Sequence, residues 1–427
     1  MNKLFSLLIA MIISMTVFSQ NLSLKEQALE QFKAEHYNDA INLLEQALKQ
    51  SPDDAEIYFH LGCFNHYNAY DSRPLKGYDF VFTERIFEYL DKAIELNPNY
   101  GDAKYFYSAE CGSLAMNEMQ NYDAEKVKYY YELAFKKGTF PKWLIEYGRN
   151  MLSGCGENAI LFTGGDADFN ICSYLQICKN FRTDVTVIPI GLTDRPWYVS
   201  LLKKGLENTV RRINIDLTEE QIMDIRPFKW RETNIFIDIS PADRLKFDLA
   251  EDYKMKWAVV PDLQSYRMHS KIEGEEPTRR TLLSPQRAIL LQIVEDNFSE
   301  RPIYFSIGAD PSFLGGLEVY FQNCGLVNRL TPITTADTQY QIDVAKLEKL
   351  FKAKNLTNYK NVKENNFPRI SGTVVYGYPS ILLKLANYYR FSGKENALKQ
   401  LTELYKNQLK IGFNEEYEEY VTKELEK

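Results

Sequence analysis

Small and apolar residues recur at helical spacing in the part of the chain that follows residue 20. Ala28 and Ala40 lie twelve residues apart, and Pro52 follows the second helical pattern. A second unit of the same kind closes at Pro98. Two helices of one hairpin can cross closely only where the side chain is small. The alanines therefore predict the crossing points of successive helical hairpins.

The repeat length, close to 34 residues, is that of the tetratricopeptide repeat. We predict tetratricopeptide hairpins over residues 20–140, with an insertion near 71–82 and a third, degenerate hairpin over 105–137. Three stacked repeats are about the minimum for a stable array. We expect the concave face of this array to bind a protein partner.

The pattern changes after Pro141, where short apolar runs alternate with helical segments. Strands at 158–163 and 183–190, each followed by a helix, predict a right-handed βαβ unit. We therefore predict a Rossmann-like, largely parallel α/β domain over 141–336. Residues 337–427 are expected to be a C-terminal helical region, with a degenerate tetratricopeptide-like hairpin. Further strands are expected at 234–239, 257–260 and 302–307.

Residues 1–19 have the pattern of a secretory signal peptide. Lys3 precedes an apolar run, and Val17 and Ser19 are small residues at positions −3 and −1 before Gln20. The run is shorter than the roughly 20 apolar residues of a membrane-spanning helix. We expect cleavage between Ser19 and Gln20, a periplasmic or otherwise exported mature chain, and no membrane span in that mature chain.

The net charge of −7 makes nucleic acid an unsuitable partner. The cysteines show no CxxC motif and no Cys/His cluster, so they predict no zinc site. Buried thiols, with at most one disulfide, are the favoured interpretation, and the sequence does not choose among pairings. The six cysteines are Cys63, Cys111, Cys155, Cys172, Cys178 and Cys324.

Two blocks of sequence lie between Arg149 and Ile333: NAILFTGGDADFNICSYLQICKNFRTDVTVIPIGLTDRPWYVSLLKKG, and ERPIYFSIG followed by GLEVYFQNCGLVNRLTPI. In these blocks the sequence resembles the soluble C-terminal region of a bacterial family of membrane proteins related to protein O-mannosyltransferases. The resemblance implies an α/β fold. The family pattern, strand–GDxD–helix with YLQ, RTDV and WY, is met by Gly165, Asp166, Asp168, Tyr174, Leu175, Gln176, Arg182, Thr183, Asp184, Val185, Trp197 and Tyr198.

Two departures from that family limit what the resemblance implies. This sequence shows no counterpart of the family's multi-helix glycosyltransferase part, so we do not expect the sugar-transfer reaction. Phe169 and Asn170 stand where the family tends to have threonine and then phenylalanine, and Pro196 replaces an acidic residue.

The segment from Thr163 to Asp168 joins a predicted strand to a predicted helix, the position where open α/β sheets bind ligands. Gly164 and Gly165 permit close backbone approach, and a helix N-terminus favours anions. Asp166 and Asp168 could together hold a divalent cation through oxygen ligands. The favoured interpretation is that one aspartate caps the helix and the other is solvated. No organic cofactor is expected.

Four residues after the second strand are expected to line the same crevice. An aromatic pair beside charged groups suits stacking on a sugar ring, but a tryptophan more often anchors a helix to a sheet. No Ser/His/Asp or Cys/His set can be assembled near the crevice. The four residues are Asp194, Arg195, Trp197 and Tyr198, and Ser306, Gly308 and Asp310 could complete the rim.

These observations favour an exported scaffold or accessory protein of the cell envelope, which binds a protein partner through its repeats and has a non-catalytic α/β domain. The alternative is a glycan-binding or glycan-processing module of an envelope glycosylation pathway that uses Asp166 and Asp168. A deep pocket converging on both carboxylates would favour that alternative.

Overall fold

The computed structural model describes all residues except 1–21, 70–79, 265–279, 337 and 366. The predicted signal peptide and most of the predicted insertion lie outside the described residues. The chain divides after Glu110 into two compact units. The domain boundaries drawn from the sequence stay a prediction.

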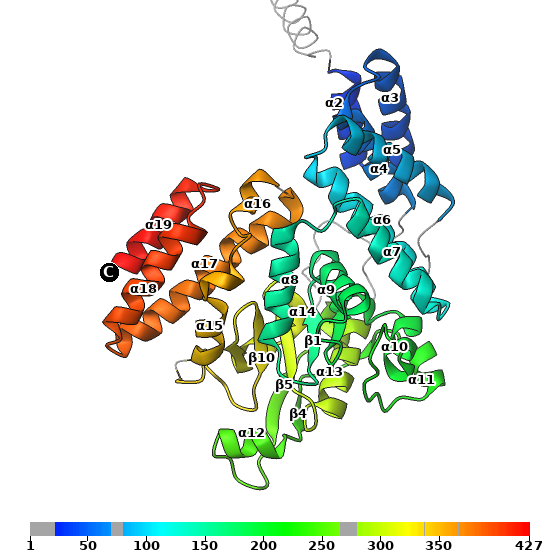
Figure 1. Ribbon diagram of the computed structural model, residues 1–427. Coiled ribbons are helices and arrows are strands. Elements are labelled where there is room, and N and C mark those ends of the chain that lie inside the picture. The colour runs from blue at the N-terminus through cyan, green and yellow to red at the C-terminus, as the bar shows by residue number, and fades with distance from the viewer. Residues whose placement is uncertain (1–21, 70–79, 265–279, 337, 366) are drawn as a thin grey trace, which may run out of the picture. The chain divides into compact units, whose positions relative to one another are not determined.

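The first unit consists of helical hairpins, as the repeat pattern predicts (Figure 1). Ala28 and Ala40 are completely buried where α2 and α3 pack together. A Cβ on Gly62 would lie 2.6 Å from Leu90 Cδ2, so the second hairpin also needs a small residue at its crossing point. The helices are α2 (Leu24–Lys33), α3 (Tyr37–Gln50), α4 (Ala55–Ala69) and α5 (Thr83–Leu96), with a short turn η1 (Phe80–Phe82) before α5.

The second unit is built on a five-stranded mixed sheet with the order β2-β1-β8-β10-β9. Strand β1 is parallel to β2 and β8, whereas β10 is antiparallel to β8 and β9. The prediction of a largely parallel sheet is wrong for the β9–β10 half. These two strands are joined by a tight turn at Gly325 (φ +96°), which can only return the chain antiparallel. The strands are β1 (Ile160–Thr163), β2 (Thr186–Pro189), β8 (Ile303–Ser306), β9 (Phe321–Asn323) and β10 (Val327–Leu330).

The strands predicted at 234–239 and 257–260 do not join this sheet. They form a separate antiparallel pair, β4 (Thr233–Ile237) with β5 (Met255–Val259). Burial alternates along β5, as expected of a hairpin with one solvated face, and the Trp257 indole donates to Gly315 O at 2.8 Å. A small three-stranded sheet contains β3 (Phe228–Lys229), β6 (Leu263–Gln264) and β7 (Arg280–Leu283).

Helices of the second unit pack around the mixed sheet (Figure 1). The start of α13 is capped by its sequence, because Ser284 Oγ accepts a hydrogen bond from Arg287 N and Pro285 follows at the first helical position. All six cysteines are thiols, and only Cys178 is not buried. The helices are α7 (Ala124–Lys136), α8 (Lys142–Gly154), α9 (Asp166–Lys179), α10 (Pro196–Lys204), α11 (Glu219–Met223), α12 (Pro241–Lys246), α13 (Pro285–Asn297) and α14 (Pro311–Leu314), while α6 (Gly101–Gln120) spans the division between the units.

The chain ends in helices that hydrogen-bond to α8. Glu146 accepts from the Thr357 hydroxyl at 2.8 Å and from Asn358 N at 3.1 Å. The Asn150 amide donates to Asn355 O at 2.7 Å and to the Tyr378 hydroxyl at 2.9 Å. The elements are α15 (Val344–Leu350), η4 (Ala353–Asn355), α16 (Asn361–Glu364), α17 (Pro368–Phe391), α18 (Glu395–Leu404), the wider turn η5 (Tyr405–Leu409) and α19 (Glu415–Glu426). No helix in the described part of the chain combines the length and hydropathy needed to cross a membrane.

Candidate functional site

The predicted ligand loop lies where the carboxyl ends of β1 and β8 meet. Thr163 ends β1 and is buried, with no hydrogen-bond partner for its hydroxyl among the described residues. Gly165 is the N-cap of α9, Asp166 is exposed at the first helical position, and Asp168 is buried. The structure therefore places the loop at the predicted edge of the sheet.

Gly164 is required by the packing of this edge. A Cβ at residue 164 would lie 2.0 Å from the carbonyl oxygen of Gly308, which follows β8. A Cβ added at Gly165, by contrast, would have no other heavy atom of the described residues within 4 Å. The first glycine thus allows two backbone segments of the protein to approach each other. Backbone packing within the protein therefore accounts for Gly164, while the predicted ligand-binding role of the loop stays a prediction.

Asp168 is the centre of a buried hydrogen-bond cluster. Its Oδ2 accepts from Ser306 Oγ at 2.6 Å, and its Oδ1 accepts from the Tyr147 hydroxyl at 3.2 Å. Burial raises the pKa of Asp168, and the two hydroxyl hydrogen bonds oppose that shift. The carboxyl group therefore links α9 to β8 and to α8.

Neither aspartate occupies the N-cap of α9, contrary to the helix-cap interpretation. Gly165 is the N-cap residue and has no side chain that could accept a capping hydrogen bond. Asp166 is exposed while Asp168 is buried, so the two carboxyl groups lie in different environments. Among the residues described, no group of three or more His, Cys, Asp or Glu side chains could hold a metal ion. A cation shared by the two aspartates stays a prediction.

The four residues after β2 contact the protein itself. Asp194 Oδ2 accepts from Gln286 Nε2 at 2.8 Å, and its Oδ1 lies 3.3 Å from Arg195 Nε; burial raises the Asp194 pKa. Trp197 packs edge-on against Tyr198, with ring centroids 5.4 Å apart. Tyr198 is buried, and its hydroxyl donates to Val187 O at 3.5 Å. These contacts hold the start of α10 against β2.

The polar residues of the YLQ and RTDV motifs bind backbone groups. Gln176 Nε2 donates to Arg182 O at 2.8 Å and to Val185 O at 2.7 Å. Arg182 donates to Leu152 O at 2.7 Å and pairs with Asp184 at 2.7 Å. The Arg182 hydrogen bond, with help from the backbone N–H of residue 158, lowers the pKa of Asp184 to about 2. The motifs therefore fix the turn between α9 and β2 and the end of α8.

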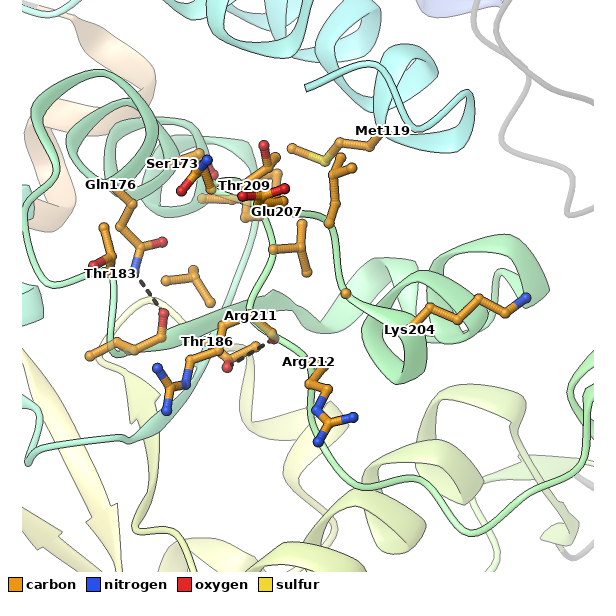
Figure 2. Close-up of a pocket in the computed structure, with 17 residues that line it drawn as sticks. Met119, Ser173, Gln176, Thr183, Thr186, Lys204, Glu207, Thr209, Arg211 and Arg212 are labelled. Atoms are coloured by element: carbon orange, nitrogen blue, oxygen red, sulfur yellow. Dashed lines mark hydrogen bonds between the residues drawn. The ribbon is translucent and has the colours of Figure 1, made fainter. Parts of the chain in front are cut away.

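Sequence reasoning missed a pocket of about 440 Å³ on the other side of this turn (Figure 2). Its walls come from α9, from the start of β2 and from the segment 204–212. The side chains that line it include Ser173, Gln176, Thr183, Thr186, Thr209 and the ring of Phe169. Its lining combines hydroxyl and amide groups with apolar and charged side chains, which suits a small polar ligand; the charged residues are Lys204, Glu207, Arg211 and Arg212.

The two buried threonine hydroxyls of this pocket differ. Thr186 Oγ1 donates to Arg211 O at 3.1 Å and accepts from Arg301 Nη2 at 2.8 Å. Thr209 Oγ1 is buried with no hydrogen-bond partner among the described residues. In Figure 2 the charged ends of Lys204 and Arg212 point away from Gln176 and Thr183. Glu207 and Arg211 also line the pocket, so a ligand would meet charged groups of both signs together with the hydroxyl and amide groups.

Comparison with known proteins confirms the resemblance between Arg149 and Ile333. The family model of the TMEM260-associated domain 2 matches residues 144–229 and 226–348, and a TPR repeat model matches residues 28–65. Protein O-mannosyl-transferase tmem260 of Dictyostelium discoideum is 30% identical over 53 residues. Those residues are 12% of this chain and 6% of that protein. The chain thus combines a tetratricopeptide repeat with a region similar to a TMEM260-associated domain.

Proposed function

We propose that this chain is an exported accessory protein of the cell envelope that binds a protein partner through its tetratricopeptide hairpins. The α/β region serves as a non-catalytic scaffold in this proposal. Export is supported by the signal pattern of residues 1–19, and the partner by the general use of such repeats in protein interactions.

The use of the motif side chains within the fold carries the non-catalytic part of the proposal. Asp168 has hydroxyl donors on both oxygens, and Gln176 and Arg182 donate to backbone carbonyl groups. A general acid or base must reach a substrate proton, and these groups are directed to the protein instead. They stabilise the domain, and Gln176, which lines the pocket of Figure 2, donates its amide hydrogens to the Arg182 and Val185 carbonyl groups.

Partly exposed aromatic rings on the hairpins are the contacts we expect a partner to use. Tyr37 and Tyr67 both pack against Phe32, with centroid distances of 5.5 and 5.3 Å, and neither is fully buried. Rings held in this way offer a large contact area at low entropy cost.

Site-specific photo-crosslinking tests the partner-binding role. A photoreactive amino acid at Tyr67 should give one discrete adduct in envelope extracts, which mass spectrometry identifies. The same amino acid at Tyr420, which is 53% exposed on α19, is the control. Equal adducts at both positions, or none at Tyr67, would refute the role of the hairpins. An intact mass that starts at Gln20, measured on periplasmic protein, tests export separately.

A second candidate is a glycan-binding or glycan-processing module of an envelope glycosylation pathway. The buried Thr209 hydroxyl in the pocket of Figure 2, which has no partner in the described part of the chain, favours it, together with the similarity to a protein named as an O-mannosyl-transferase. The sequence predicts the Asp166–Asp168 loop as the site of this function. We place the glycan instead in the pocket of Figure 2, whose volume is about 440 Å³. Titration with mannose and mannobiose, monitored by NMR, should shift Thr209 and Ser173 signals in this case. Unchanged spectra would refute this second candidate, and the scaffold proposal would then be the only one of the two that stands.

A further inference from the structure

A second hollow, of about 410 Å³, lies between α8 and the segment 354–358. We call it the α8 groove. It has no residue in common with the pocket of Figure 2 or with the Asp168 cluster. Its lining residues come from the outer face of α8, from Phe181 and from η4 with the residues that follow it.

Three cationic side chains border the α8 groove: Lys142, Arg149 and Lys354. All three are exposed, and within the described chain none has a carboxylate at ion-pair distance. The Arg149 guanidinium lies 4.6 Å from the centroid of the Phe181 ring. Stacking on this ring restricts the orientation of the guanidinium, so its paired N–H donors are positioned in advance for an oxyanion.

The acidic residue of the groove is already engaged. The Glu146 carboxylate accepts from the Thr357 hydroxyl, from Asn358 N and from Asn358 Nδ2, all within 3.1 Å. These donors fix the carboxylate against the segment 357–358. The three cations therefore exceed the anions of the groove by two charges, and Ser153 adds a hydroxyl group beside them.

Lysines close to the groove in the sequence add to its positive electrostatic potential. Residues 346–363 contain six lysines and one acidic residue, Glu348, in a chain whose net charge is −7. The total charge of the protein hides this local excess. Lys352, Lys360 and Lys363 are exposed close along the chain to the groove. A hollow with an excess of one sign of charge concentrates ligands of the opposite sign.

We propose that the α8 groove binds a small phosphate monoester. Such an ester carries close to two negative charges at neutral pH, which matches the excess of two cations, and its oxygens fit the guanidinium fork of Arg149. A volume of about 410 Å³ suits a small molecule rather than a macromolecule. The remaining hydroxyl and amide groups would hold the polar body of the ester. This site is independent of partner binding by the hairpins.

Isothermal titration calorimetry at low salt tests the proposal with three probes: inorganic phosphate, a hexose 6-phosphate and the unphosphorylated hexose. The two phosphates should bind saturably, and the hexose should not. Arg149→Gln should weaken phosphate binding about tenfold or more, since it removes a charge-assisted pair of hydrogen bonds. Phe181→Leu keeps every charge but removes the stacking, and it should weaken binding about two- to fivefold.

Lys399→Gln is the matched control, because it removes one exposed lysine from α18, outside the groove. Its affinity should equal that of the parent. All three side chains are partly exposed or at the surface, and thermal melts with circular dichroism check that each variant folds. The proposal is overturned if no saturable heat appears up to about 10 mM phosphate. It is also overturned if Lys399→Gln weakens binding as much as Arg149→Gln, or if the hexose binds equally well.

Discussion

Helix α9 borders two regions of opposite character. At its first turn Asp168 belongs to a closed cluster in which backbone segments of β1 and β8 touch. Two turns later Ser173 and Gln176 face the open pocket of Figure 2. The closed region carries the glycine–carboxylate motif that suggests a ligand, and the open region carries no motif of that kind.

A polar motif at a strand–helix junction therefore does not by itself mark a binding site. In the closed region Gly164 packs against the carbonyl group of Gly308, and the Asp168 carboxyl group accepts hydrogen bonds from two hydroxyl groups. In the open region a buried hydroxyl has no partner among the described residues. A buried hydroxyl without a partner among the described residues also occurs at Thr163 in the closed region, so such a group indicates a ligand or water position only where it borders open space, as Thr209 does.

The largest expected effect concerns the closed region. Gly164→Ala would place a Cβ 2.0 Å from Gly308 O, so backbone must move. We expect a loss at or above the upper end of the ~1–3 kcal/mol typical of overpacking. Gly165→Ala is the control, because its Cβ has free space and its φ of −178° is open to any residue. Urea unfolding measures both, and equal midpoints would show that the two backbones are not in contact.

An intermediate effect is expected at Asp168. Asp168→Ala leaves the Ser306 and Tyr147 hydroxyls without their acceptor, which should cost about 1–3 kcal/mol in the free energy of unfolding. Asp166→Ala, at an exposed position, should cost less. A larger loss at Asp166 would contradict the placement of the two aspartates.

The pH dependence of stability should follow the same carboxyl group. Burial raises the pKa of Asp168, so just above the unfolded value of about 3.9 the native state keeps a proton that the unfolded chain has lost. The stability contribution of Asp168 therefore falls as pH rises from about 4 through the folded pKa. Asp168→Asn cannot titrate and should become more stable relative to the parent over that range. Unfolding series at several pH values, with Asp166→Asn as control, decide this; a constant difference would show that the Asp168 pKa is not raised.

The smallest expected effect concerns the open region. Thr209→Val removes a hydroxyl that has no partner, so stability should stay the same or rise by up to about 1 kcal/mol. Thr186→Val removes a hydroxyl with two partners and should cost about 1–3 kcal/mol. Differential scanning calorimetry compares the pair. A larger loss in Thr209→Val would mean that its hydroxyl is satisfied in solution.

Sequence patterns identified the elements whose local signal is strong. Ala28 and Ala40 mark a helix crossing because no larger side chain fits there, and β1 and β8 are continuous apolar runs buried at every residue. The strands expected at 234–239 and 257–260 are present as β4 and β5, but the sequence prediction did not foresee that they pair with each other outside the five-stranded sheet. The alternation of buried and exposed residues in β5 distinguishes it from a central strand, and that signal was present in the sequence.

The candidate sites were less predictable because they depend on contacts between distant segments. The position of Thr163–Asp168 at the sheet edge followed from the strand–helix order. The role of Gly164 depends on Gly308, which lies 144 residues later in the sequence. The pocket of Figure 2 is closed by the segment 204–212, whose residues form no motif. The α8 groove likewise forms only because α8 lies beside residues 354–358, and no local sequence pattern predicts that these two segments are in contact.

The hydrogen bonds between α8 and the segment after residue 350 have a consequence for limited proteolysis. Glu146 and Asn150 bind Thr357, Asn358, Asn355 and Tyr378, and the Trp143 indole donates to Asn365 O at 3.1 Å. A protease that cuts the exposed segment near Lys352 would separate the chain covalently without removing these bonds. The two fragments should therefore elute together in gel filtration, and they should dissociate only in denaturant. The C-terminal helices are held to α8 by contact as well as by chain connection.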